Sequence, residues 1–141
     1  MTRSLALHLP RRARGQALVE FAIAFPILIL AMVAVMEMGF YALTQTAINH
    51  GAHEGGRVAA LPGTTAESSV TSRVITASEP VVVTSSNISV AVNGVTGTFT
   101  TKKTGDRVVV RVNHTHRPLL GLVFGSGVTF ALSAESEFRV E

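Results

Sequence analysis

The sequence predicts an α+β fold: a long N-terminal helix, a small antiparallel β-sheet and one additional short helix. Three observations predict it. An apolar stretch of helical length begins near residue 16, valine-rich alternating runs fill the C-terminal half, and a short helix signal lies between them. Because a sheet with one apolar face must be covered, we expect the second half of the long helix and the short helix to pack on it.

The first 15 residues form a basic leader. They contain four arginines and no acidic residue, a net charge of +4, whereas residues 16–141 hold 8 basic and 9 acidic side chains, a net of −1. Positive charge beside an apolar segment favours the cytoplasmic side of the membrane. The basic excess therefore predicts a cytoplasmic N-terminus, and it does not predict a nucleic-acid partner. The chain has no cysteine, which excludes disulfides and thiolate chemistry.

The apolar segment is long enough to span a membrane. No charged residue occurs from Phe21 to Met36, and with its semi-polar flanks the segment runs from Ala17 to about Leu43. These 27 residues would form a helix of about 40 Å, which crosses a bilayer with some overhang. A secretory signal peptide has a shorter apolar stretch that ends in small residues, so we expect this anchor to be retained.

Two features shape the predicted helix. Pro26 removes one hydrogen bond and clashes with the carbonyl of Ala22, so we expect a bend there without termination, because a membrane helix can satisfy the freed carbonyl. After Leu43 the pattern becomes amphipathic, and the Pro62-Gly63 pair should end the helix. Three glycines weaken this second half but leave a smooth face for a closely packed backbone: Gly51, Gly55 and Gly56.

The C-terminal domain, residues 61–141, contains the remaining elements. Capping-box spacing from Thr64 to Glu67 predicts a short helix from Thr65 to about Ala77. Strands are expected over residues 81–84, 88–92, 95–101, 107–116 and 128–140, with an Asn93-Gly94 turn between the second and third. Alternation in the last two strands predicts two apolar faces: Val108, Val110 and Val112 on one strand, and Phe130, Leu132, Ala134, Ser136 and Phe138 on the other.

Glu20 is the most informative single residue. A charge in hydrocarbon costs several kcal/mol unless it is paired, although a carboxylate just inside the headgroups is an alternative. Cleavage after Gly15 would supply a partner, because Gln16 would then carry a cationic amine and Glu20 would be the fifth residue of the mature chain.

The segment from Arg14 to Ala22, followed by Pro26 and by Glu37-Met38-Gly39, resembles the N-terminus of the TadE-like family. These proteins are minor pilins, or pseudopilins, of tight-adherence (Flp/Tad) pili, a branch of the type IV pilus superfamily. The small-residue stretch from Gly51 to Arg57 is also similar to that family. The specific part of the resemblance covers about residues 14–57.

The resemblance implies a pilin-like fold and a role for each matching residue. Gly15 would precede the bond cut by a membrane prepilin peptidase, since no side chain obstructs an extended backbone there, and Gln16 would be the new N-terminus. Glu20 would pair with a mature N-terminal amine, its own or a neighbour's, with Phe21 packed beside it. Pro26 matches a proline of the family.

Other positions of the helix are expected to contact neighbouring subunits. Small side chains allow close helix packing, and Ala22, Ala31 and Gly39 are the main positions of this kind. Glu37 lies about 25 Å beyond Glu20 by helical rise. It would either pair with a neighbouring subunit or lie in the far membrane interface.

No metal, cofactor or catalytic site is predicted. The rings of His50 and His53 share a helical face, but their order with Glu54 matches no zinc-protease motif, and an exposed polar helix explains them better. His114 and His116 share a strand face without an evident third ligand. No arrangement of nucleophile and base has a recognisable context, so the sequence does not predict an enzyme.

Basic residues gather near one predicted hairpin. A solvated edge strand that resists aggregation is the ordinary explanation, and contact with an acidic surface is the alternative. The residues concerned are Lys102, Lys103, Arg107 and Arg111.

The sequence therefore predicts a leader (1–15), a helix (16–60, membrane-spanning over about 17–43) and an exported domain (61–141). The resemblance implies a minor pilin that supports pilus assembly and surface adhesion. Its partners would be a prepilin peptidase, other pilin subunits, the assembly machinery and the cytoplasmic membrane. It would cross that membrane once and enter an extracellular pilus. The alternative is a single-pass, membrane-anchored extracytoplasmic binding domain without an assembly role; a membrane-anchored hydrolase has little in its favour.

Overall fold

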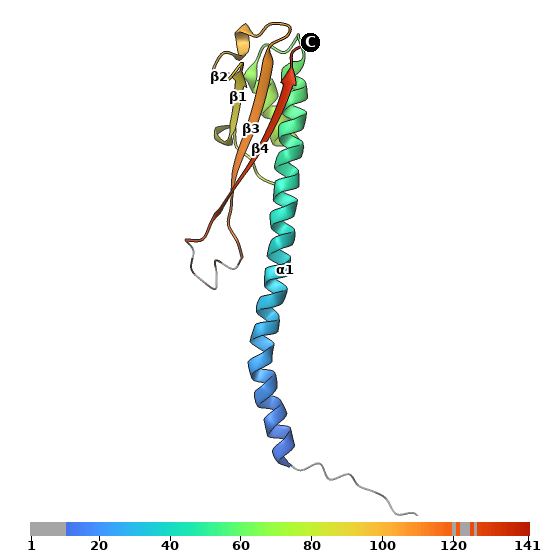
Figure 1. Ribbon diagram of the computed structural model, residues 1–141, viewed down its shortest axis with the longest axis vertical. Helices are drawn as coiled ribbons and strands as arrows, with labels where there is room; N and C mark the ends of the chain where they lie inside the picture. Colours follow the sequence, from blue (N-terminus) through green and yellow to red (C-terminus); the bar gives the residue numbers. More distant parts are fainter. Residues whose placement is uncertain (1–10, 120, 122–124, 126) are drawn as a thin grey trace, which may run out of the picture. The chain divides into compact units, whose positions relative to one another are not determined.

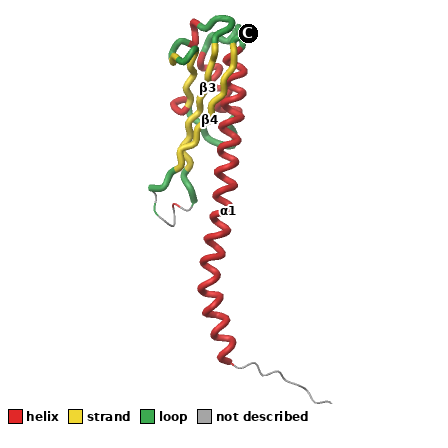
Figure 2. Tube along the Cα trace, viewed as in Figure 1, coloured by secondary structure: helices red, strands yellow, loops and turns green. Residues whose placement is uncertain are grey.

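The computed structural model describes residues 11–119, 121, 125 and 127–141 (Figure 1). The first ten residues of the predicted leader lie outside this description. Contacts within the chain group residues 1–36 and 37–141 into two units. Within the described residues, the elements are a long N-terminal apolar helix, one further α-helix and a four-stranded antiparallel sheet (Figure 2). The predicted α+β class is confirmed.

Helix α1, Arg11–Ala60, is continuous over 50 residues. It begins earlier than the expected start near Gln16, because the arginines and alanine before Gly15 are good helix formers and one glycine does not interrupt them. Pro26 lies inside α1 and does not terminate it. The helix ends directly before the Leu61-Pro62-Gly63 turn, as its sequence predicts.

The sheet has the order β2-β1-β3-β4, in which all neighbours are antiparallel. Its strands are β1 (Ile88–Val92), β2 (Val95–Thr96), β3 (Arg107–His116) and β4 (Phe130–Arg139). The two long strands pair over their whole lengths, from Arg107 opposite Arg139 to His116 opposite Phe130. The predicted alternation of β3 and β4 is confirmed, because Val108, Val110, Val112, Leu132 and Ala134 are buried.

Two of the predicted strands differ from the structure: one is absent, and the other is shorter than predicted. Residues 81–84 form no strand and lead into the 3₁₀ helix η1, Ser85–Asn87. The strand expected over 95–101 ends at Thr96, because Gly97 has a φ of +80°, which an extended strand does not allow. The 3₁₀ helix η2, Phe99–Thr101, follows. Val83 and Phe99 are nevertheless buried, so these apolar residues join the core without strand pairing.

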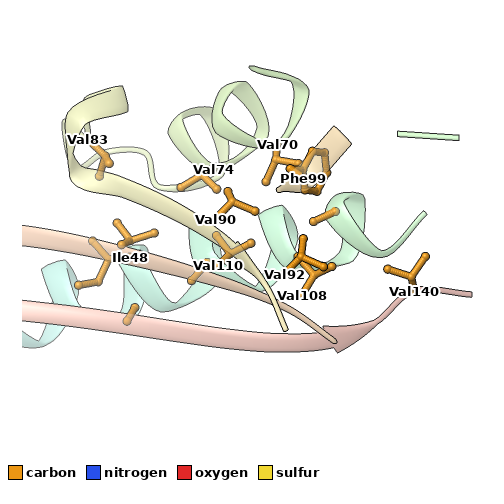
Figure 3. Packing of buried hydrophobic residues seen from close by; sticks show 14 of the residues in the cluster. Ile48, Val70, Val74, Val83, Val90, Val92, Phe99, Val108, Val110 and Val140 are labelled. Carbon is orange, nitrogen blue, oxygen red and sulfur yellow. The ribbon is translucent and has the colours of Figure 1, made fainter. Parts of the chain in front are cut away.

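The core lies between the inner face of the sheet and the two helices (Figure 3). The second half of α1 contributes Ile48, Ala52 and Ala59, and α2 (Glu67–Ala77) contributes Val70 and Val74. Helix α2 begins at Glu67 after Ala66, which makes no side-chain cap bond. The capping box predicted from Thr64 is therefore wrong, because Glu67 is the first helical residue and not the third.

The glycines of α1 allow close packing within the unit. A Cβ atom at Gly51 would lie 2.0 Å from the Oγ of Ser78 and 3.0 Å from the carbonyl oxygen of Val74. At Gly55 it would lie 2.3 Å from Val74 Cγ2, and at Gly56 2.6 Å from the Phe138 ring. The predicted smooth face is therefore confirmed, and this chain's own α2 and β4 occupy it.

We predict that Gly51→Ala lowers the free energy of unfolding by about 1–3 kcal/mol, because overpacking forces α2 away from α1. Denaturant unfolding of the full chain in detergent micelles, followed by circular dichroism, measures the change. Gly63→Ala is the matched control, since a Cβ there meets nothing within 4 Å. Equal stability of the two variants would contradict this packing.

Candidate functional site

Glu20 is exposed on the apolar part of α1. The Nε2 of Gln16 donates a hydrogen bond to its Oε1 at 3.1 Å, one helical turn away. Its neighbours Val19 and Phe21 are each 61% exposed. The amide of Gln16 is neutral, so this bond leaves the charge of the carboxylate uncompensated.

The other predicted positions of this segment also lie on α1. Gly15 is helical, and a Cβ there meets nothing within 4 Å. The rings of Phe21 and Phe25 lie 5.2 Å apart between centroids. Ala22 and Ala31 are exposed, as is every residue from Gly15 to Met32. This surface is thus free for lipid or for other helices.

Glu37, in contrast, is buried, with 8% of its surface exposed. Its Oε1 lies 2.6 Å from the Nε2 of His116, and its Oε2 accepts a hydrogen bond from the backbone N–H of Leu119 at 2.7 Å. Tyr41, one turn further along α1, contacts the rings of His116 and Phe130 edge-on. The distances between ring centroids are 6.5 and 6.4 Å. These contacts fasten α1 to the end of the β3–β4 hairpin.

The sequence pattern groups His116 with His114 and does not predict its contact with Glu37. The available signal was the alternation of β3, which places both rings on the apolar face after Val112. A polar ring on a buried face requires a hydrogen-bond partner. Burial lowers the pKa of His114, and the neighbouring His116 lowers it further.

Gly39 lies between the contacts of Glu37 and Tyr41, but on an open surface. A Cβ there would meet nothing within 4 Å. No described part of this chain therefore uses Gly39 for close packing, and its expected contact with a neighbouring subunit stays a prediction.

The comparisons with known proteins bear on this helix. A family model described as TadE-like protein matches residues 15–57. This segment is TadE-like. No curated protein and no solved structure matches the chain. The family recognised in the sequence is thereby confirmed over the part of α1 that contains every predicted site residue.

The TadE-like segment suggests a protein associated with the tight-adherence pilus, from a structural family that is not known for catalysis. Among the described helices, one is long and apolar enough to cross a membrane by length and composition, Gly15–Ala60. Together the family and the helix suggest single-pass membrane anchoring and partners within the pilus.

Near its end, the TadE-like segment is joined to the rest of the folded unit. Glu54 pairs with Arg73 of α2 at 2.6 Å, and this hydrogen bond lowers the pKa of Glu54. The ring of His53 lies 5.1 Å from that of Phe138. Glu54 and His53 therefore make packing contacts, and the described residues contain no cluster of three or more potential metal ligands.

The basic residues near the hairpin have partners within the chain. Arg111 and Arg107 reach Glu135 and Glu137 of β4 at 2.6 and 3.4 Å. Because β3 is an interior strand, the predicted edge position of these arginines is wrong.

Lys102 stabilises the end of α1. Its Nζ donates to the carbonyls of Ala59 and Leu61, the latter at 2.8 Å, and lies 4.5 Å from the centre of the Phe99 ring. Burial lowers the pKa of Lys102. This lysine satisfies carbonyl groups that a helix end leaves without intrahelical partners.

We predict that Glu37→Ala speeds hydrogen exchange at the Leu119 amide by roughly 5- to 100-fold, since an unsatisfied donor costs about 1–3 kcal/mol. Amide exchange by NMR in detergent micelles measures it. Glu37→Gln is the matched control, because its side-chain oxygen can still accept a hydrogen bond from Leu119. Unchanged protection of Leu119 in Glu37→Ala would show that this contact does not hold the hairpin.

Proposed function

We propose that this chain is a minor pilin, or pseudopilin, of a tight-adherence pilus that supports pilus assembly and surface adhesion. Before assembly, the chain resides in the cytoplasmic membrane with its N-terminus in the cytoplasm and its β-domain outside. The observation that carries the proposal is Glu20, an exposed carboxylate on an apolar helix inside the TadE-like segment. Within the described residues, the hydrogen bond that it accepts comes from a neutral amide.

Processing after Gly15 supplies the missing charge. The bond lies in the second turn of α1, so a prepilin peptidase must unwind the start of the helix to reach it. Helix ends fray readily, and glycine costs about 1 kcal/mol of helix stability relative to alanine. Gly15 therefore makes local unwinding easier, in addition to leaving the bond without a side chain in the way.

Cleavage also changes the charge at the helix start. The first turn of α1 contains no acidic residue, and the sequence before Gly15 carries arginines, which the positive end of a helix dipole disfavours. Removing them leaves the amine of Gln16 one turn from Glu20. The amine can then pair with its own Glu20 or with that of an adjacent subunit.

Pairing between subunits would direct assembly. A carboxylate in hydrocarbon is costly unless it is paired, so docking of a neighbour's amine on Glu20 favours one register of the two helices. The exposed small residues Ala22 and Ala31 allow the backbones to approach. The other pilin subunits and the assembly machinery are the corresponding partners.

The membrane-anchored binding domain without an assembly role makes the opposite prediction about the leader. Intact-mass and N-terminal peptide analysis of the membrane-embedded chain, with and without prepilin peptidase, separates the two. We expect a chain that begins at Gln16 only when the peptidase is present. A chain that keeps residues 1–15 in both samples would favour the binding-domain function.

We predict that Glu20→Ala and Glu20→Gln abolish pilus assembly while the chain is still inserted and cut, because both remove the charge that the amine needs. Pili are counted by electron microscopy, and processing is checked by mass. Glu67→Ala is the matched control, an exposed glutamate in the first turn of α2. Normal pili in the Glu20 variants would refute the pairing.

A further inference from the structure

We infer that one end of the folded unit rests on the lipid bilayer through a collar of exposed apolar side chains. The collar consists of Met38, Phe40 and Tyr41 of α1, with Leu119 and Phe130 at the end of the β3–β4 hairpin. Its partner is the headgroup and upper acyl region of the membrane. The inference deepens the membrane anchoring of the proposed function and rests on it.

The collar is one connected group within residues 37–141. Tyr41 contacts the rings of Phe130 and His116, and Glu37 binds both His116 and the Leu119 amide. Met38 directly follows Glu37 in the helix. The contacts of Glu37 and Tyr41 therefore bring this part of α1 and the end of the hairpin, far apart in sequence, to the same place.

These side chains remain open despite the contacts. Met38 is 73% exposed, and Phe40, Tyr41, Leu119 and Phe130 are 43–46% exposed. Exposed apolar side chains gathered at one end of a folded unit indicate an interaction surface. Tyr41 adds an amphipathic ring of the kind that is enriched where membranes meet water.

The position along α1 identifies lipid as the partner. Glu37 is buried in protein, so we take Met36 as the last residue of the membrane-spanning part of the helix. The segment from Ala17 to Met36 has 20 residues and a helical length of about 30 Å, the thickness of the hydrocarbon core. The collar begins two residues later, where the headgroups would begin.

Charge also fits a lipid surface. No acidic residue occurs between Glu37 and Glu54, nor between Asp106 and Glu135, so apart from the buried Glu37 these segments carry no carboxylate near the collar. Arg117, two positions before Leu119 in the sequence, is exposed. A basic and apolar surface of this kind suits anionic headgroups.

Tryptophan fluorescence tests the inference, because the chain contains no tryptophan. The full chain is reconstituted in vesicles of phosphatidylethanolamine and phosphatidylglycerol with brominated acyl chains, which quench nearby indoles. Phe130→Trp should lose emission and shift to shorter wavelength. Met38→Trp, at a position that is 73% exposed, should do the same and serves if Phe130→Trp does not fold.

Two further variants calibrate the result. Leu28→Trp, inside the apolar segment, must be quenched if the chain is anchored, and Val95→Trp, exposed on β2, must not be. Water-like, unquenched emission at residues 38 and 130 beside a quenched Leu28→Trp would overturn the collar and leave the anchoring intact. Blue-shifted but unquenched emission would also overturn it, because protein would then cover the collar. An unquenched Leu28→Trp would overturn the anchoring itself.

Discussion

A carboxylate on an apolar helix must find a partner, and this constraint organises the molecule. Helix α1 carries two such groups, Glu20 and Glu37, separated by 16 uncharged residues. Glu37 is satisfied within the chain by His116 and the Leu119 amide. Glu20 has a neutral amide beside it. Glu37 therefore serves the fold of the chain itself, and we propose that Glu20 pairs with the amine that cleavage creates.

Contacts along the second half of α1 hold the other elements of the folded unit in place. The bonds of Glu37 hold one end to the β3–β4 hairpin, and Lys102 caps the other end at Ala59 and Leu61. Between them, Gly51 and Gly55 bring α2 close. The helix is thus the common support of the sheet and of α2, although no disulfide is available to brace a domain of this size.

Local patterns predicted the parts of the fold that depend on local chemistry. Alternation identified β3 and β4 because each buries one face, and the Pro62-Gly63 turn ended α1. The segments wrongly predicted as strands are apolar for another reason. Val83 and Phe99 lie outside the strands but fill the core. The sequence did not predict the order of the strands in the sheet, which is why Arg107 and Arg111 were expected at an edge.

The candidate site also has one part that local sequence predicts and one part that it does not. Gly15, Gln16 and Glu20 lie within a few residues of one another, so a single segment of sequence shows their relation. Glu37 and His116 are 79 residues apart, and nothing local in either neighbourhood indicates the other. Their pairing needed the register of β3 and its packing on α1, which are properties of the folded unit.

The central claim is that cleavage gives Glu20 its cation. Solid-state NMR on assembled, processed chains, with ¹⁵N on the amine of Gln16 and ¹³C on the carboxyl of Glu20, measures their separation directly. The account predicts a dipolar coupling that corresponds to an ion-pair distance of about 4 Å or less. Mixing singly labelled chains distinguishes a neighbour's amine from the chain's own. Processed, assembled chains without such a coupling in either sample would contradict the account.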